Sequence, residues 1–191
     1  MWKKISTEDI PYGHSSKIHE FIKDEVTRQG HDINDPNDGG RRVGWMHGAW
    51  EYARQNADRL PTIEDVQRLG HYIEPENNHP SRFRGINVSV GTHEPPKHQD
   101  VPGRMASLMT SMPFVRACAD DCGGDNKKTD YYETSGYGHP HATPDDFYLQ
   151  FESIHPFADG NGRTGKILHN WLNGTLDKPK LIDDYYGGGN P

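Results

Sequence analysis

The stretch His155-Pro156-Phe157-Ala158-Asp159-Gly160-Asn161-Gly162-Arg163-Thr164-Gly165-Lys166 decides the fold that we expect and the chemistry that this chain could support. It gathers an imidazole, a carboxylate, three glycines and two cations within one turn. Apolar residues before and after it repeat at helical spacing, which predicts a helix, a loop and a second helix. A loop that leads into a helix N-terminus presents unpaired amides and the positive end of the helix dipole, and both favour an anion.

The backbone and the two cations of this turn suit phosphate groups. Gly160 and Gly162 let the chain curl close to an anion without a Cβ in the way. Arg163 and Lys166 lie three residues apart, so both can lean over the first turn of the second helix. We therefore expect Gly160, Asn161, Gly162, Arg163 and Lys166 to bind phosphate.

Two further side chains of the turn could supply chemistry. Asp159 lies where a carboxylate could hold a magnesium ion that bridges two phosphates. His155 is the candidate general base of the stretch. Together with the phosphate site, they suggest transfer chemistry on a nucleotide, in which an incoming hydroxyl group is deprotonated.

Other interpretations of the same residues are weaker. Asp-Gly-Asn-Gly is also a common turn formula, and each residue taken singly would be structural more often than not. Residues 160–166 also match the first seven positions of the phosphate-binding loop G-x-x-x-x-G-K-[ST]. However, Ile167 takes the place of the metal-binding hydroxyl, and a helix rather than a buried strand precedes the loop. The joint pattern over the whole stretch therefore favours the transferase interpretation.

The rest of the chain is expected to be mainly α-helical. Helical spacing of apolar residues and N-cap signals recur along the sequence. The expected helices span residues 15–27, 42–56, 61–74, 101–112, 143–154 and 163–172. Between them, residues Arg84–Gly91 alternate apolar and polar side chains between glycines, which predicts a strand.

Composition limits the classes of partner. The formal charge of −7 argues against general nucleic-acid binding. No apolar run approaches the length of a membrane span, and the N-terminus lacks the apolar stretch of a signal peptide. We therefore expect a cytoplasmic protein without nucleic-acid or membrane partners.

The two cysteines of the chain allow one more hypothesis. Cys118 and Cys122 could form a zinc site with His139 and His141. Two incidental thiols and two surface histidines are the simpler interpretation, because neither pair has the tight-turn C-x-x-C spacing.

The stretch 155–166 strongly resembles the signature of Fic-domain proteins, H-x-F-x-[DE]-G-N-G-R-x-x-R, and differs from it only at the last specified position. Residues Phe147–Ile154 and Phe83–Gly91 resemble that family's lead-in helix and its β-hairpin flap. The resemblance implies a Fic-type helical bundle with a small β-hairpin. It divides the chain into an N-terminal extension (1–41) with a possible regulatory helix (15–27), a catalytic domain (42–173) and a C-terminal tail (174–191).

The resemblance implies roles for individual residues. His155 would take the proton from a Ser, Thr or Tyr hydroxyl of a target protein, and Asp159 would hold Mg²⁺ against the phosphates of ATP. The region around Asn161 and Gly162 would form the anion hole, and Arg163 would grip the phosphates. The outcome implied is protein adenylyl transfer with release of pyrophosphate.

The flap implied by the resemblance would bind the target. It would pair with the backbone of the target protein by β-augmentation and so place the hydroxyl for attack. The flap residues are Ile86, Asn87, Val88, Ser89 and Val90.

Lys166 stands where the family usually has a second arginine, which holds the outer phosphate and is the contact of an inhibitory glutamate. Lysine keeps the charge but loses the bidentate fork. A Fic-type transferase that uses another nucleotide or phosphoryl donor therefore stays open, as does a catalytically silent nucleotide-binding module.

Three possibilities for regulation stay open, and the first is an inhibitory helix within the chain. Ser16-Lys17-Ile18-His19-Glu20-Phe21 matches the first five positions of the family's inhibitory motif [ST]-x-x-x-E-[GN], with Phe21 in place of the small residue. Ser16 and Glu20 would then be the inhibitory residues. The alternatives are an antitoxin-like partner protein and no inhibition at all.

Overall fold

The computed structural model describes residues 16–112 and 143–183, and in these two ranges the chain forms six helices. This confirms the expected mainly α-helical fold. The helices are α1 (Ser16–Arg28), α2 (Gly39–Gln55), α3 (Ile63–Ile73), α4 (Val101–Met109), α6 (Pro144–Ile154) and α7 (Asn161–Leu172).

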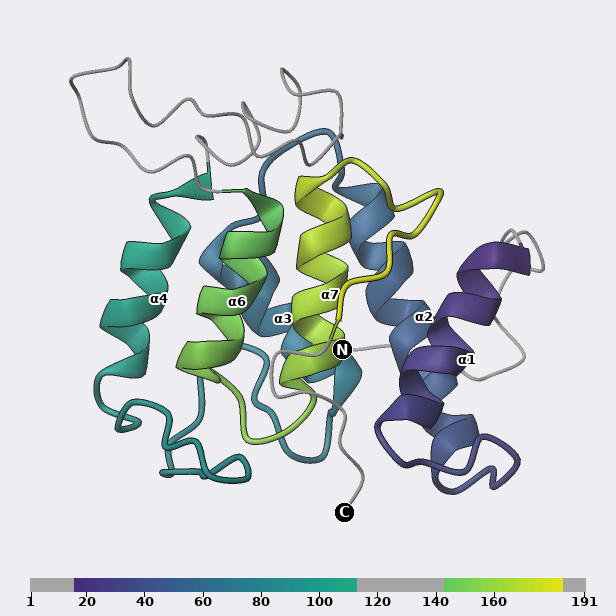
Figure 1. The fold of residues 1–191 in the computed structure, drawn as a ribbon, viewed down its shortest axis with the longest axis horizontal. Coiled ribbons are helices and arrows are strands. Elements are labelled where there is room, and N and C mark those ends of the chain that lie inside the picture. The colour runs from purple at the N-terminus through teal and green to yellow at the C-terminus, as the bar shows by residue number, and fades with distance from the viewer. Residues whose placement is uncertain (1–15, 113–142, 184–191) are drawn as a thin grey trace.

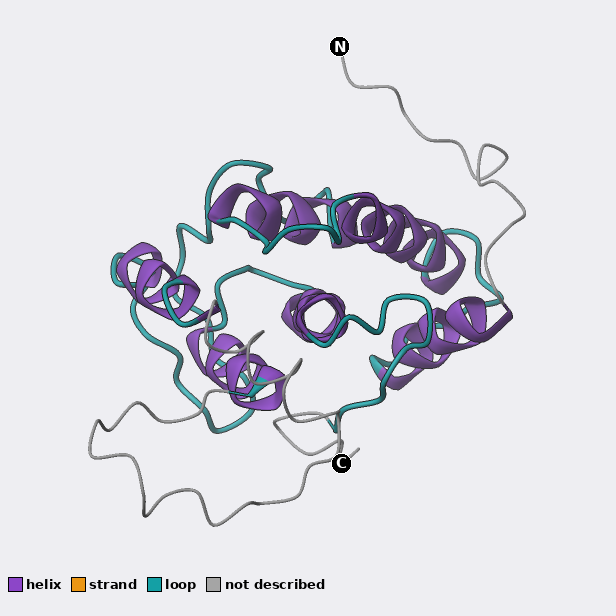
Figure 2. Cartoon of the chain, turned by 90° about the horizontal axis from the view of Figure 1, so that it is seen from above, coloured by secondary structure: helices purple, strands orange, loops and turns teal. Residues whose placement is uncertain are grey.

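Helix α7 is the centre of the bundle (Figures 1 and 2). It packs against α2, α3 and α6, and Figure 2 shows it nearly end-on with the other helices around it. All of its residues except Gly162 are buried. A helix surrounded on every side fixes the residues at its N-terminus firmly, and that terminus is the end of the predicted phosphate turn.

Two helices begin with the capping arrangement that their sequences predict. The Thr143 side chain accepts a hydrogen bond from the Asp146 amide (3.1 Å), and the Thr143 amide donates to the Asp146 carboxylate (2.9 Å). Pro144 takes the first helical position of α6, where its missing amide proton costs nothing. Thr62 and Asp65 form the same reciprocal cap at the start of α3.

Helix α1 shares the hydrophobic core of the bundle. It packs against α2, and the rings of Phe21 and Trp50 lie 5.1 Å apart. Ile18, Ile22 and Val26 of α1 are buried in the same cluster. Helix α2 begins at Gly39, so it crosses the boundary that we expected between an N-terminal extension and residue 42.

The start of the C-terminal segment also packs onto the bundle. The Leu176 side chain is buried, and its carbonyl accepts a hydrogen bond from the Trp50 indole (2.9 Å). The first residues of the segment expected as a tail therefore belong to the folded unit.

The segment expected as a strand makes almost no backbone pairing. In the described ranges the chain contains no strand, only one antiparallel bridge between Val90 and His93. Gly91 turns the chain with a φ of 57°, and Pro95 and Pro96 follow, which have no amide proton for a ladder. The β-hairpin flap therefore stays a prediction.

Across the described residues, no helix is both long and apolar enough to cross a membrane. The candidate zinc ligands Cys118, Cys122, His139 and His141 lie outside the described residues.

Candidate functional site

His155 ends α6 in an unusual backbone conformation. Its φ of 50° and ψ of 64° are left-handed, and it is the only non-glycine residue with positive φ in the described parts of the chain. Its amide still donates to the Phe151 carbonyl at 3.0 Å. Left-handed geometry is costly for a residue with a Cβ, and such strain concentrates at functional sites.

The loop after His155 is anchored by two buried side chains. The Phe157 ring lies 5.7 Å from that of Phe83 and 6.4 Å from that of Phe151. The Asn161 side chain accepts from the Phe157 amide (2.9 Å) and donates to the Phe157 carbonyl (3.0 Å). Since both polar atoms of Asn161 are used in this way, what it can offer an anion is its backbone amide.

Gly160 makes the turn into α7 and packs tightly. Its φ is 74°, and a Cβ there would lie 2.5 Å from the Ile73 side chain. The Asn78 amide group donates to the Asp159 carbonyl (2.8 Å) and to the Gly70 carbonyl (2.9 Å), which ties this turn to α3. The amides of residues 161–163 then open α7 and have no acceptor inside the helix.

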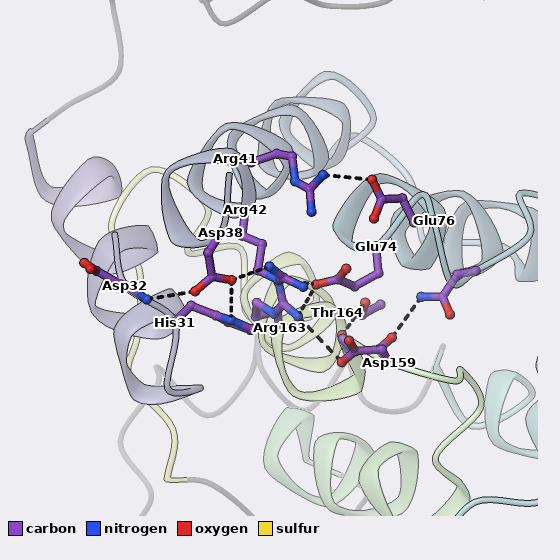
Figure 3. A network of polar contacts seen from close by, with 12 residues as sticks. His31, Asp32, Asp38, Arg41, Arg42, Glu74, Glu76, Asp159, Arg163 and Thr164 are labelled. Atoms are coloured by element: carbon purple, nitrogen blue, oxygen red, sulfur yellow. Dashed lines mark hydrogen bonds and ion pairs between the residues drawn. The ribbon is translucent and has the colours of Figure 1, made fainter. Parts of the chain in front are cut away.

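Arg163 lies in a buried network of charges (Figure 3). Its Nη2 donates to the Glu74 carboxylate at 2.7 Å, and both side chains are only 1% exposed. The same Glu74 oxygen accepts from Nε of Arg42 at 2.8 Å, and Arg42 also pairs with Asp38. Nε and Nη1 of Arg163 are buried and have no hydrogen-bond partner among the described residues.

Asp159 fits a magnesium ion that is held mainly by phosphates. Its side chain is 46% exposed and lies 3.8 Å from Arg163. One carboxylate oxygen accepts a hydrogen bond from the Gly160 amide (2.6 Å), and the second oxygen takes no part in that bond. Mg²⁺ is usually bound by one or two carboxylates, water and substrate phosphates, so a single exposed carboxylate is sufficient. No group of three or more His, Cys, Asp or Glu side chains suited to a metal occurs in the described ranges.

Lys166 is not directed to solvent. Its ammonium group contacts the Glu25 carboxylate of α1, and both side chains are 0% exposed. Glu20 and Ser16, the residues expected to inhibit, are exposed on the same helix. The structure therefore places Glu25, rather than Glu20, against the last residue of the signature.

The imidazole of His155 is held in its neutral form. Burial lowers the pKa of His155 to about 4, a hydrogen bond to the Glu152 backbone acts in the opposite direction, and the nearby Arg84 charge lowers the pKa further. A neutral imidazole can accept a proton from a substrate.

The expected flap residues lie beside this loop. Ile86, Asn87 and Ser89 are exposed, with Ile86 at 60%, while Val88 and Val90 are partly buried. The flap is joined to the loop where the Arg84 amide donates to the Pro156 carbonyl at 2.9 Å. A cavity of about 330 Å³ lies at this junction, lined by residues of the 77–86 segment and by Phe157 and Ala158.

Sequence reasoning missed four residues that shape the site: Glu25, Glu74, Asn78 and Arg84. Glu25 carried a signal, because it falls seven residues after Ile18 on the apolar face of α1. A carboxylate on an apolar stripe requires a buried partner. Glu74, Asn78 and Arg84 lie in or beside loops and follow no periodic pattern.

Comparison with known proteins agrees with the signature. Residues 59–172 match the sequence model of the Fic/DOC family. Among solved structures, the chain is similar to a Fic domain containing signaling protein from Bacteroides thetaiotaomicron, with 20% identity, a TM-score of 0.47, and coverage of 69% of this chain and 46% of that one. It is also similar to a Fic family protein from Desulfovibrio desulfuricans, with 17% identity, a TM-score of 0.46, and coverage of 87% and 61%. The chain therefore spans less than two thirds of the length of each of these proteins.

Proposed function

The chain belongs to the Fic/DOC family, and from that premise we propose that it is a protein adenylyltransferase, which transfers AMP from ATP to a Ser, Thr or Tyr hydroxyl of a target protein. The observation that carries the proposal is the buried edge of Arg163, where Nε and Nη1 have no acceptor among the described residues. Buried donors without acceptors are unfavourable, and phosphate oxygens would satisfy both at once. The opening amides of α7 lie on the same turn and add to the anion site.

In the proposed reaction, the neutral imidazole of His155 accepts the proton of the target hydroxyl. The hydroxyl oxygen then bonds to the α-phosphorus of ATP, the bond from that phosphorus to the bridging oxygen breaks, and pyrophosphate leaves. Arg163 and the amides of residues 161–163 hold the phosphates. Asp159 would hold Mg²⁺, which when bound neutralises phosphate charge.

The target is proposed to dock on residues Ile86–Val90. Within the described chain, the amides and carbonyls of residues 86–89 make no hydrogen bond to other backbone groups. Among them, the Ile86 carbonyl accepts a hydrogen bond from the Arg84 side chain. A mostly exposed segment with unpaired amides and carbonyls can add a strand from another protein.

Helix α1 is proposed to restrain the enzyme. Lys166 could reach an outer phosphate only after it separates from Glu25, so the ion pair would keep the nucleotide site incomplete. In this proposal the inhibitory element is part of the chain itself, and an antitoxin-like partner is not required.

The same ion pair favours a second candidate, a nucleotide-binding module without transferase activity. If Glu25 holds Lys166 permanently, the chain could bind ATP and capture a target without modifying it. This candidate predicts ATP binding by calorimetry with no transfer to any protein.

The deciding experiment compares two labels of ATP. The protein is mixed with Mg²⁺, a cell lysate and ATP labelled at either the α- or the γ-phosphate. Label from the α-phosphate alone supports adenylyl transfer, whereas label from the γ-phosphate alone indicates phosphoryl transfer. His155→Ala is the control, and equal labelling by this variant would refute His155 as the base. Parallel reactions with the four nucleoside triphosphates identify the donor.

A further inference from the structure

Arg84 is a buried cation that makes no ion pair with a carboxylate in the described part of the chain. Only 7% of the residue is exposed. Its guanidinium donates to three backbone carbonyls: Nε to His155 (2.8 Å), Nη1 to Ile86 (2.7 Å) and Nη2 to Pro96 (2.5 Å). Burying a charge in this way is unfavourable unless its donors are satisfied, and here each of the three nitrogens donates one hydrogen bond.

These three carbonyls belong to the two parts of the proposed site. The His155 carbonyl lies at the left-handed residue that supplies the base. The Ile86 carbonyl lies at the start of the segment on which a target would dock, and the Pro96 carbonyl lies in the chain that follows that segment. The Arg84 amide adds a fourth bond, to Pro156 (2.9 Å). One side chain and its own backbone therefore connect the docking segment to the loop that holds the base.

We propose that Arg84 is a positioning residue of the transfer reaction, whose guanidinium holds the His155 backbone in its left-handed conformation and fixes the docking segment relative to it. This inference rests on the proposed function. A planar fork with donors in fixed directions can hold three acceptors at once. The ammonium group of lysine is a compact point donor and cannot span the same three carbonyls.

The consequence is a link between target docking and alignment of the base. A target strand that pairs along residues 86–90 would pull on a segment whose first residue Arg84 joins to His155. Small displacements of a reacting group cost large factors in rate. Loss of the fork should therefore lower kcat while leaving nucleotide binding unchanged, because Arg84 contacts none of the residues assigned to phosphate.

The test uses the full chain with Arg84→Lys, Arg84→Gln and the control Arg104→Gln, which removes a charge from an exposed position of α4. Transfer kinetics are measured with labelled ATP, and folding is checked by circular dichroism. Both Arg84 variants should lose about tenfold or more in kcat with KM for ATP changed by less than about twofold. Arg104→Gln should behave as wild type. A folded Arg84 variant with wild-type kcat, or one that loses kcat and ATP affinity in equal measure, overturns the proposal.

A second readout does not depend on activity. NMR titration of the His155 imidazole, in protein without nucleotide, should give a higher pKa in Arg84→Gln than in wild type, because a nearby positive charge has been removed. Arg84→Lys keeps the charge, so its kcat tests the fork even if Arg84→Gln does not fold. An unchanged pKa in folded Arg84→Gln would place the guanidinium away from the base and overturn the proposal. If wild-type protein transfers nothing, the proposed function fails, and this titration still decides the placement of Arg84.

Discussion

The Glu25 carboxylate on α1 contacts the Lys166 ammonium group on α7, and neither side chain is exposed to solvent. The two residues are 141 positions apart in the chain. Because Lys166 closes the signature turn, this pair joins the first helix to the proposed nucleotide site. Its removal has consequences for both activity and stability.

Replacing Glu25 with alanine should raise the rate of self-modification with labelled ATP, because Lys166 is then released to contact phosphate. The matched control is Glu20→Ala on the same helix, where the side chain is exposed and the rate should stay at the wild-type value. Breaking a buried pair costs about 3–5 kcal/mol, so folding of the variant is checked first by thermal denaturation. Equal labelling by folded Glu25→Ala and wild type would remove the inhibitory role of α1.

The pH dependence of stability should reflect the lowered pKa of the buried His155 imidazole. Folded His155 stays neutral down to a pKa of about 4, whereas an unfolded histidine takes up a proton near pH 6.5. Between these values the unfolded state binds more protons, so the contribution to stability is complete above about pH 6.5 and is lost as the pH falls toward 4. Its upper limit is about 3 kcal/mol.

The measurement is the free energy of unfolding of wild type and His155→Ala, obtained from urea titrations between pH 4 and 8. As the pH falls, the free energy of unfolding should decrease more for wild type than for His155→Ala. The transfer rate should show no imidazole titration between pH 6 and 8. A difference in unfolding free energy that is independent of pH would contradict the lowered pKa.

Two glycines test how tightly the loop after His155 is packed. A Cβ on Gly70 of α3 would lie 2.4 Å from the Phe157 ring, whereas a Cβ on Gly48 of α2 would meet nothing within 4 Å. Gly70→Ala should lose about 1–3 kcal/mol of stability, because the ring is buried and has no room to move. Gly48→Ala should be neutral or gain up to about 1 kcal/mol, since alanine is the better helix former. Thermal denaturation of both variants checks this, and equal melting temperatures would show that Phe157 can shift.

Local signals in the sequence predicted the helices and the turn well. The start of α6 at Thr143 and Pro144 was predicted because capping depends only on neighbouring residues. The contact between Glu25 and Lys166 could not be predicted in the same way. Helical spacing places Glu25 on the buried face of α1, but only the packing of α1 beside α2 and α7 decides which residue it meets.

In the segment after Arg84, a local sequence pattern was not sufficient to predict the structure. Alternation of apolar residues predicted a strand, whereas the described residues contain only the isolated bridge between Val90 and His93. A strand also needs a partner strand. The residues after Gly91 include Pro95 and Pro96, which have no amide proton to donate to such a pairing. The three carbonyls bound by Arg84 come from parts of the chain that no local pattern relates.

The buried pair of Glu74 and Arg163 provides the last test, with a matched pair at the surface. Glu74 has a 1% exposed side chain and contacts both Arg42 and Arg163, whereas Glu76 is 61% exposed and contacts Arg41. Glu74→Gln should lose on the order of 3 kcal/mol, because the buried guanidinium group of Arg163 and the partly buried one of Arg42 lose their shared negative charge. Glu76→Gln should lose less than about 1 kcal/mol, as is usual for exposed pairs.

ATP with Mg²⁺ should then raise the melting temperature of Glu74→Gln more than that of wild type. Phosphate at Arg163 would restore part of the missing negative charge, so binding and folding become more strongly coupled in the variant. The measurement is thermal denaturation with increasing ATP at fixed Mg²⁺, with Glu76→Gln as the control. An equal rise in all three proteins would mean that the nucleotide phosphates do not contact Arg163, and the proposed role of that residue would have to be abandoned.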